Sequence, residues 1–259
     1  LPLPGSAPGD RSRLRAALLR WMIRQTDAVC VNSRYLAASA AAYTSEFVHV
    51  TYFGVSPVFF RSRGGERASG EPLRVAMVKS FNENSGIDTL LTAMKKAADD
   101  GVPMILRAVG TDPGGSAKDL ARRLGIADRV EFLGVLREEE IARVFSLSDV
   151  YVQPTKFTEG FGVAVVEAQA VGLPAVVSSV GGLVETIEGE SGVMIPPDDP
   201  EALARALISY AADQDMLVRA RSAAQVNAKR FAWDVVAPAM DSVYDRLLAN
   251  GARRTHKRP

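Results

Sequence analysis

The chain has 259 residues, of which 47% are hydrophobic and 24% charged, and its 31 basic and 30 acidic residues leave a net charge of +1. This balance argues against a nucleic-acid-binding protein. No apolar run reaches the ~18 residues that a membrane-spanning helix requires, the single cysteine excludes an internal disulfide, and the two histidines argue against a histidine-centred metal site. We therefore expect a globular protein of the cytoplasm, whose arginine-rich ends would allow a peripheral position at the inner face of a membrane.

The N-terminal part of the chain predicts a small α/β segment. Apolar residues recur at helical spacing over residues 11–25, which predicts an amphipathic helix that packs on a sheet. A helix that lies on lipid is the alternative. Short apolar runs at residues 27–32 and 47–53 predict strands, with a helix over residues 34–43 between them. Cys30 lies among apolar neighbours, and we expect it to be a small buried side chain.

The rest of the chain alternates between strands and helices. A polar, glycine-rich stretch at residues 61–72 indicates a linker. The strands expected after it are residues 73–78, 104–109, 129–133, 149–153, 175–177 and 192–195, and the helices are residues 87–98, 116–124, 138–147, 183–187, 199–212, 216–229 and 231–248, with another short helix before Gly172. Apolar strands separated by amphipathic helices predict a parallel sheet with helices on both faces.

This pattern divides the chain into four parts. Residues 1–56 are the end of an N-terminal domain, residues 57–72 a linker, residues 73–230 a Rossmann-like domain, and residues 231–259 a C-terminal crossing helix with a basic tail. The apolar stripe of that last helix requires a partner surface on one of the two domains. Because the chain begins with a leucine instead of a methionine, we expect that an upstream part precedes it.

Four loops at one edge of the predicted sheet form the candidate site. In open parallel sheets, ligands bind beyond the C-terminal ends of the strands. The loops there each contain glycine, which lets the backbone approach a ligand closely. They are residues 79–86, 110–115, 154–162 and 180–182. One glycine loop is weak evidence of a site, but four on a shared edge predict that the ligand binds there.

Two carboxylates mark the third of these loops and the helix that follows it. Glu159 precedes the turn 160–162, GFG, which opens a helix whose free backbone N–H groups would attract a phosphate. This residue is either a capping carboxylate or a ligand contact. Glu167, eight residues further on, is either exposed, salt-bridged, or free to accept two hydrogen bonds from a ribose diol. A glycosidase acid–base pair fits less well, because one carboxylate lies in a loop and the other in a helix.

The segment around these glutamates resembles a known enzyme family. Residues 158–187, TEGFGVAVVEAQAVGLPAVVSSVGGLVETI, are similar to the signature of the retaining glycosyltransferases of the GT4 family, which have the GT-B fold. The hallmark of that family is two glutamates separated by seven residues, here Glu159 and Glu167. The segments GIDTLLTAM, RVEFLGVL, SDVYVQPT and IPPDDPEALARAL also fit, so the resemblance covers roughly residues 20–248.

The resemblance implies a function for the Rossmann-like domain and for its residues. It would bind a nucleotide-sugar donor, while residues 1–56 would end an acceptor domain that is largely absent from the chain. Glu159 would be the catalytic-site carboxylate that contacts the sugar, and Glu167 would bind the ribose. The further donor-binding residues would be Gly160, Phe161, Gly162 and Val163 through their backbone, and Phe132 to Val135 along the base. No metal or cofactor other than the donor is implied, since backbone N–H groups and basic side chains would stabilise the leaving diphosphate.

One loop departs from the family pattern. After the first donor-domain strand the family has an arginine, and five residues later a lysine before a glycine. The corresponding residues here are Ser80 and Ser85, and Lys79 lies beside the first of them. The loss of two cations opposite a diphosphate should weaken its stabilisation by several kcal/mol. Lys79 or another basic residue would then have to substitute, or the donor is unusual, or activity is weak.

These features favour a hexosyltransferase-like enzyme that moves a sugar from a nucleoside diphosphate to an acceptor hydroxyl with retention of configuration. The acceptor would be a small molecule, a glycan or a lipid-linked molecule, and a missing N-terminal domain or an associated chain would complete catalysis. The alternative is a non-catalytic nucleotide-sugar-binding module, which Ser80 and Ser85 favour. A sugar phosphorylase of similar fold has no specific support in the sequence.

Overall fold

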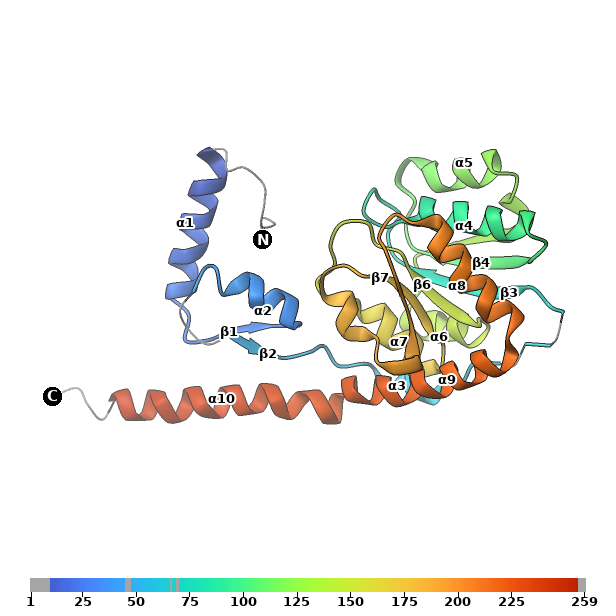
Figure 1. Ribbon diagram of the computed structural model, residues 1–259. Helices are drawn as coiled ribbons and strands as arrows, with labels where there is room; N and C mark the ends of the chain where they lie inside the picture. The colour runs from blue at the N-terminus through green and yellow to red at the C-terminus, as the bar shows by residue number, and fades with distance from the viewer. Residues whose placement is uncertain (1–9, 45–47, 66, 69, 256–259) are drawn as a thin grey trace. The chain divides into compact units, whose positions relative to one another are not determined.

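The computed structural model of the protein describes residues 10–44, 48–65, 67–68 and 70–255 (Figure 1). They form two compact units. Unit 1 contains the described residues up to Gly54 and those from Trp233 onward, and unit 2 is Val55–Ala232. The last four residues of the expected basic tail, 256–259, lie outside the described part. None of the helices in the described ranges combines the length and the apolar character that crossing a membrane requires.

Unit 1 is built on a small parallel sheet. Its elements are α1 (Asp10–Arg24), β1 (Val29–Val31), α2 (Arg34–Ala40), β2 (Val48–Val50) and α10 (Trp233–Thr255). The two strands pair with Val29 opposite Val48. The side chain of Ser33 caps α2, because it accepts a hydrogen bond of 3.1 Å from the backbone N–H of Leu36.

Two expectations for unit 1 are wrong. The apolar face of α1 does not pack on the sheet, since Leu14, Leu18 and Trp21 are 74%, 56% and 61% exposed. The two described strands of this unit are three residues long each and offer too little surface to cover a helix. Cys30 is exposed and not buried. Successive strand residues point to opposite faces, so it faces away from the partly buried residues on either side of it.

Unit 2 contains the predicted parallel sheet. Its strands are β3 (Leu73–Val78), β4 (Met104–Val109), β5 (Val130–Gly134), β6 (Val150–Gln153), β7 (Ala175–Ser178) and β8 (Gly192–Ile195), and its helices are α3 (Pro57–Arg61), α4 (Ile87–Asp99), α5 (Ser116–Arg123), α6 (Glu138–Ser146), α7 (Val163–Val171), α8 (Pro200–Ala212) and α9 (Gln214–Ala228). All six strands run parallel in the order β5-β4-β3-β6-β7-β8. A 3-10 turn, Gly181–Thr186, replaces the short helix expected at residues 183–187.

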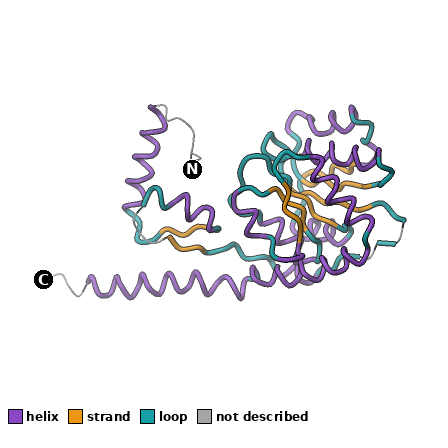
Figure 2. Tube along the Cα trace, in the orientation of Figure 1, coloured by secondary structure: helices purple, strands orange, loops and turns teal. Residues whose placement is uncertain are grey.

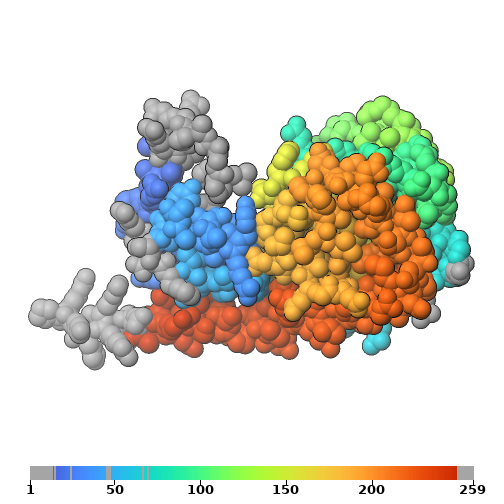
Figure 3. Space-filling model, viewed as in Figure 1, coloured from blue at the N-terminus to red at the C-terminus, as the bar shows by residue number. Residues whose placement is uncertain are grey.

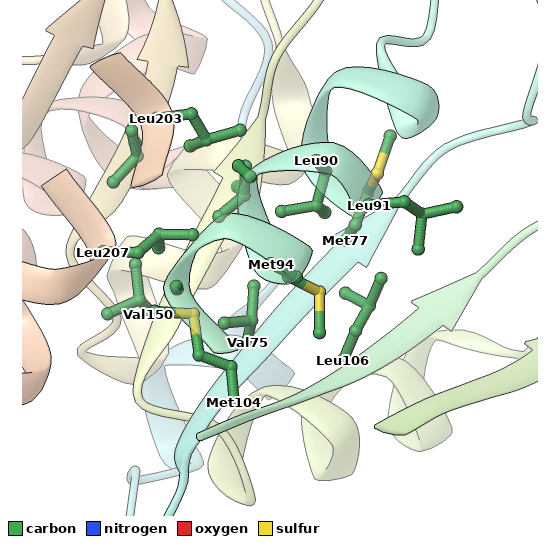
Figure 4. Close-up of a cluster of buried hydrophobic side chains, with 14 of the residues drawn as sticks. Val75, Met77, Leu90, Leu91, Met94, Met104, Leu106, Val150, Leu203 and Leu207 are labelled. Atoms are coloured by element: carbon green, nitrogen blue, oxygen red, sulfur yellow. The ribbon is translucent and has the colours of Figure 1, made fainter. Parts of the chain in front are cut away.

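Helices cover both faces of this sheet, as predicted (Figure 2). The space-filling view in Figure 3 shows α4 and α5 (green) and α8 (orange) on the outside of unit 2. One face of the sheet packs against these helices, and the labelled side chains of Figure 4 are Val75, Met77, Met104, Leu106 and Val150 of the sheet, Leu90, Leu91 and Met94 of α4, and Leu203 and Leu207 of α8. On the other face, the ring of Phe145 of α6 packs against two aromatic rings. Its centroid lies 5.6 Å from the ring centroid of Tyr151 and 5.9 Å from that of Phe59 of α3. Every residue of β6 and β7 is buried, which explains why apolar residues predominate in both strands.

The segment expected to be a linker, residues 57–72, belongs to unit 2. It begins with α3, where Pro57 occupies the first helical turn. Phe59 is 1% exposed and packs in the core. The polar half of the segment is also attached, because Arg67 is 7% exposed and donates to the backbone oxygen of Ala211 at 2.9 Å. Its glycines and charges suggested a free linker, but long-range contacts hold it against the sheet.

A buried carboxylate provides the main attachment. Asp149, with no exposed surface, lies before β6 and accepts bidentate hydrogen bonds from Arg74 at 2.8 and 2.9 Å. Arg221 of α9 donates to the same carboxylate at 2.7 Å, and Arg67 lies 4.0 Å from it. Three guanidinium groups therefore share one buried anion, which ties the start of β3, the segment before it and α9 together.

Candidate functional site

The strand order of unit 2 identifies one edge of the sheet as the candidate site. From β3 the chain proceeds outward to β4 and β5, and then returns to place β6 on the other side of β3. The C-terminal ends of β3 and β6 are therefore the topological switch point, where open α/β sheets bind their ligands. Lys79 directly follows β3, and Glu159 lies in the loop after β6. The predicted site residues thus flank the crevice.

Glu159 is held by two neighbouring side chains. Lys79 Nζ donates to Glu159 Oε2 and also to Thr155 Oγ1 at 2.9 Å. Gln153 Nε2 donates to the same oxygen of Glu159 at 3.1 Å. The amide of Gln153 is oriented in turn by Tyr151, whose hydroxyl donates to Gln153 Oε1 at 2.9 Å. Both donors use Oε2, and no donor among the described residues reaches Oε1.

The backbone of this loop packs against the turn after β7. Gly182 N donates to Glu159 O at 2.9 Å. A Cβ atom on Gly181 would lie 2.1 Å from Glu159 O, and one on Gly182 would lie 2.1 Å from Gly160 O. Neither distance leaves room for a side chain, which explains the two consecutive glycines. The 180–182 loop therefore supports the Glu159 loop and leaves little space between the two.

The start of α7 presents backbone N–H groups. Gly162 is its N-cap residue, with a φ of 99° that glycine adopts without strain, and no side chain caps the helix. The first two N–H groups, of Val163 and Ala164, have no acceptor within the helix, whereas Val165 N donates to Gly162 O at 3.1 Å. The side chain of Phe161 is buried, with its ring 5.3 Å from that of Phe231. Of residues 160–163, the backbone is thus the part that could contact a ligand, and the predicted contact of this backbone with a donor stays a prediction.

Glu167 lies one turn further along α7 and is partly buried. Among the described residues none donates a hydrogen bond to its carboxylate. Burial, and then the charge of Glu138 at the start of α6, raise its pKa from the ordinary 4.5 to about 7. Its negative charge, with a smaller contribution from Glu159, adds to the effect of burial in raising the pKa of the Tyr151 hydroxyl. Both glutamates are thus close enough to act on the same buried side chain.

A pocket of about 470 Å³ opens at the ends of β3, β4 and β5. Its aromatic walls are Phe81 and Phe132, whose rings meet edge to face at 6.0 Å. Lys118 Nζ lies 5.7 Å above the Phe132 ring, and Val135, 76% exposed, stands at the pocket's side. The predicted base-bordering residues, Phe132 and Val135, thus line a cavity with flat apolar walls and a cation.

Ser80 and Ser85, which correspond to the arginine and the lysine of the family pattern, have different environments in the 79–86 loop. Ser80 is exposed, and its hydroxyl oxygen accepts a hydrogen bond of 2.9 Å from Thr111 Oγ1. Ser85 has no exposed surface; its hydroxyl donates to Asn82 O at 2.7 Å and accepts from Ile87 N at 3.3 Å. Ser85 therefore stabilises the turn before α4 and does not face an open surface.

Sequence reasoning missed three polar residues of the site. Tyr151 and Gln153 alternate with apolar residues in β6, and Thr155 follows the strand. Because strand residues two apart point to the same face, a YVQ pattern at the end of an otherwise apolar strand was the available signal. The side-chain set of the site consists of carboxylates, amides, hydroxyls and amines. Among the residues that the structure describes, no group of three or more potential metal ligands lies together.

The family of the chain follows from comparison with known proteins. The model of the family described as glycosyl transferases group 1 matches residues 59–227. D-inositol 3-phosphate glycosyltransferase of Streptomyces bingchenggensis is 33% identical over 227 residues, which are 81% of this chain and 50% of that protein. The enzyme of the same name from Streptomyces griseus is 41% identical over 136 residues, which are 52% of this chain and 29% of that protein. The chain therefore spans about half the length of the first of these relatives and less of the second.

Solved structures show the same fold. Sucrose-phosphate synthase from Thermosynechococcus elongatus superposes with a TM-score of 0.80 and 26% identity, covering 94% of this chain and 65% of that one. The Anabaena protein Alr3699/HepE, solved in complex with UDP-glucose, superposes with a TM-score of 0.77 and 20% identity, covering 90% of this chain and 68% of that one. Glycosyltransferases with the GT-B fold thus share the architecture of this chain. The chain belongs to group 1 of the glycosyl transferases.

Proposed function

We propose that this chain carries the nucleotide-sugar donor site of a retaining GT4 glycosyltransferase. The observation that carries the proposal is the partly buried carboxylate of Glu167, which no described side chain or backbone group satisfies. Even partial burial of a carboxylate without a protein partner is unfavourable, and its retention is explained if a ligand supplies the donors. A ribose diol offers two hydroxyl donors, which matches the two free oxygens of this carboxylate.

The other parts of the donor are assigned along the same edge. The base occupies the pocket between Phe81, Phe132 and Val135, where flat apolar walls suit an aromatic ring. The sugar lies against the free Oε1 of Glu159. The diphosphate lies at the N-terminus of α7, where unpaired N–H groups and the helix dipole favour negative charge.

The reaction we propose is sugar transfer to an acceptor hydroxyl with retention of the anomeric configuration and without a metal ion. The backbone N–H groups at the start of α7 stabilise the diphosphate as it leaves. Retention would result from attack on the same face of the sugar from which the diphosphate departs. No protein nucleophile is assigned.

The relatives suggest the first substrates to test. A solved neighbour binds UDP-glucose, and the relatives of known sequence are named for D-inositol 3-phosphate. We therefore propose a UDP-linked hexose as the donor and a phosphorylated sugar alcohol as the acceptor. A glycan or a lipid-linked acceptor is the second choice. The acceptor site itself would include chain that corresponds to the unmatched half of the relatives.

Calorimetric titration with UDP, GDP, ADP and TDP tests the proposal, with Glu167→Ala as the site variant. Glu139, an exposed glutamate of α6, provides a matched control, Glu139→Ala. We expect one nucleotide to bind clearly better than the others, and Glu167→Ala to weaken it by about a hundredfold or more, the cost of two hydrogen bonds to a charged group. The control should bind like the unaltered chain. If none of the four binds, or if Glu167→Ala binds equally well, the donor site is wrongly assigned.

A non-catalytic module that binds nucleotide sugars is the second candidate. It is favoured by the 79–86 loop, in which Lys79 is paired with Glu159 and Ser85 is buried. Little positive charge then remains for a leaving diphosphate. An assay for the release of UDP from UDP-glucose separates the candidates. It uses the chain joined to a segment that corresponds to the unmatched half of the relatives. An enzyme releases UDP in an acceptor-dependent reaction, whereas a binding module does not.

A further inference from the structure

The side chain of Lys79 has an environment that its position at the start of the 79–86 loop, beside Ser80, did not suggest. Its side chain is 17% exposed and points toward β6, where Nζ donates to both Glu159 Oε2 and Thr155 Oγ1. Thr155 is fully buried. An amine fixed by two acceptors on one side is poorly placed to reach a diphosphate without breaking both bonds.

The backbone of Lys79 is fixed as well. Its N–H donates to Val109 O at 2.9 Å, which extends the pairing of β3 and β4 by one residue. On the other side of the peptide, a Cβ atom on Gly110 would lie 2.1 Å from Lys79 O. The β4 loop therefore packs directly on this residue. Hydrogen bonds thus fix both the backbone and the amine of Lys79, so we expect its side chain to be rigid within the candidate site.

The fixed position of Lys79 restricts the carboxylate of Glu159. Lys79 and Gln153 both donate to Oε2, and the backbone oxygen of Glu159 accepts from Gly182 N. The carboxylate can neither rotate freely nor leave the crevice without losing charge-assisted hydrogen bonds, which are about twice as strong as neutral ones. Its other oxygen, Oε1, stays available as an acceptor. This is a preorganised arrangement, in which no ordering cost remains when a hydroxyl arrives.

We propose that Lys79 is a positioning residue that orients Glu159 toward the sugar of the donor, and that it does not bind the diphosphate. This inference rests on the proposed function, since it requires a nucleotide sugar in the site. It assigns the lysine to sugar recognition. The diphosphate then depends on the α7 N-terminus alone within the described part of the site.

The two possible roles of Lys79 differ in one measurable way. UDP contains the base, ribose and diphosphate but no sugar, whereas UDP-glucose contains all four parts. A residue that acts through Glu159 affects only UDP-glucose. A residue that binds the diphosphate affects both ligands. The ratio of the two dissociation constants therefore separates the roles without depending on the overall stability of a variant.

The experiment compares UDP and UDP-glucose binding to the unaltered chain, Lys79→Met, Lys79→Arg and Glu159→Gln by calorimetry. We expect Lys79→Met to weaken UDP-glucose by about tenfold, the typical loss of a hydrogen bond to a charged group, and to leave UDP within about twofold. Lys79→Arg should restore most of the loss, because arginine also donates to a carboxylate. The double variant Lys79→Met/Glu159→Gln should lose no more than Glu159→Gln alone, since both act through one contact.

A matched control and clear contrary results complete the test. Lys95 forms an ion pair with Asp99 on the surface of α4, so Lys95→Met removes a similar pair away from the site and should change neither affinity. Equal weakening of UDP and UDP-glucose by Lys79→Met would overturn the inference and leave the proposed function intact, with the lysine on the diphosphate. Unchanged affinity for both ligands would also overturn it. Failure of the unaltered chain to bind either ligand would instead refute the proposed UDP-linked hexose donor, and the inference with it.

Discussion

Replacing Glu167 by glutamine should stabilise the protein at neutral pH and weaken nucleotide binding at the same time. The substitution keeps the shape of the side chain and removes its charge. Burial and the charge of Glu138 raise the pKa of Glu167 from 4.5 to about 7. The folded protein therefore holds a proton that the unfolded chain releases between these pH values, and the free energy of unfolding falls as the pH rises from about 4.5 to about 7.

The size of the effect follows from this shift. A difference of about 2.5 pKa units, from 4.5 to about 7, corresponds to about 3 kcal/mol at about 1.4 kcal/mol per unit. This is an upper value, because part of the side chain is in contact with water. Glutamine carries no charge at any pH, so the variant avoids the cost. We expect the two proteins to differ little near pH 4.5, and the variant to be more stable by up to about 3 kcal/mol at pH 8.

Urea unfolding followed by circular dichroism between about pH 4.5 and pH 8 measures this difference. Glu139→Gln, on the exposed surface of α6, controls for the loss of one negative charge and should show no such pH dependence. A constant difference between the unaltered chain and Glu167→Gln across this range would refute the reasoning, as would a variant that is less stable at pH 8. Opposite changes in stability and affinity are typical of a residue retained for binding.

Three further perturbations test other parts of the account. Glu138→Gln removes one of the two causes of the raised pKa, so the pH at which Glu167 titrates in the pH–stability curve should move below about 7; an unchanged midpoint would contradict the assignment. Phe132→Ala should weaken UDP and UDP-glucose by the same factor, about fivefold to a hundredfold for lost stacking on a base, in calorimetric titration; a loss confined to UDP-glucose would exclude the base pocket. Asp149→Asn leaves three buried or half-buried guanidinium groups without their anion and should cost about 3–5 kcal/mol of unfolding free energy, measured in urea; a loss below about 1 kcal/mol would show that the cluster contributes little.

The parallel sheet was predictable because its central strands are largely buried on both faces. A strand such as β3, Leu73–Val78, is apolar apart from Arg74, and its limits agree with the sequence prediction. The glycines at the strand ends were equally informative. Gly181 and Gly182 have no room for a Cβ atom, so close backbone packing demands them.

The failures have physical causes that local sequence does not contain. Phe59 and Arg67 lie in the segment expected to be a linker, residues 57–72, and only their partners in α6, α8 and before β6 make that segment part of unit 2. The exposed apolar face of α1 cannot be distinguished by periodicity from a packed one.

The site was predictable in position but not in its contacts. The glutamate spacing located both carboxylates, and the order of strands places the loop of Glu159 and the helix of Glu167 at the edge where ligands are expected. Which way Lys79 points depends on Thr155 and Glu159, which lie more than seventy residues away in the chain. Ser85 illustrates the same limit, because its hydroxyl serves the turn before α4.

The most direct test of the account is a crystal structure of the chain with the nucleoside diphosphate that binds it best. The account predicts the base in the pocket between Phe132 and Val135, both ribose hydroxyls on Glu167, and the diphosphate at the N-terminus of α7 near Gly162. Lys79 should remain on Glu159. A nucleotide bound elsewhere, or one bound here with Glu167 still without a ligand contact, would contradict the central claim.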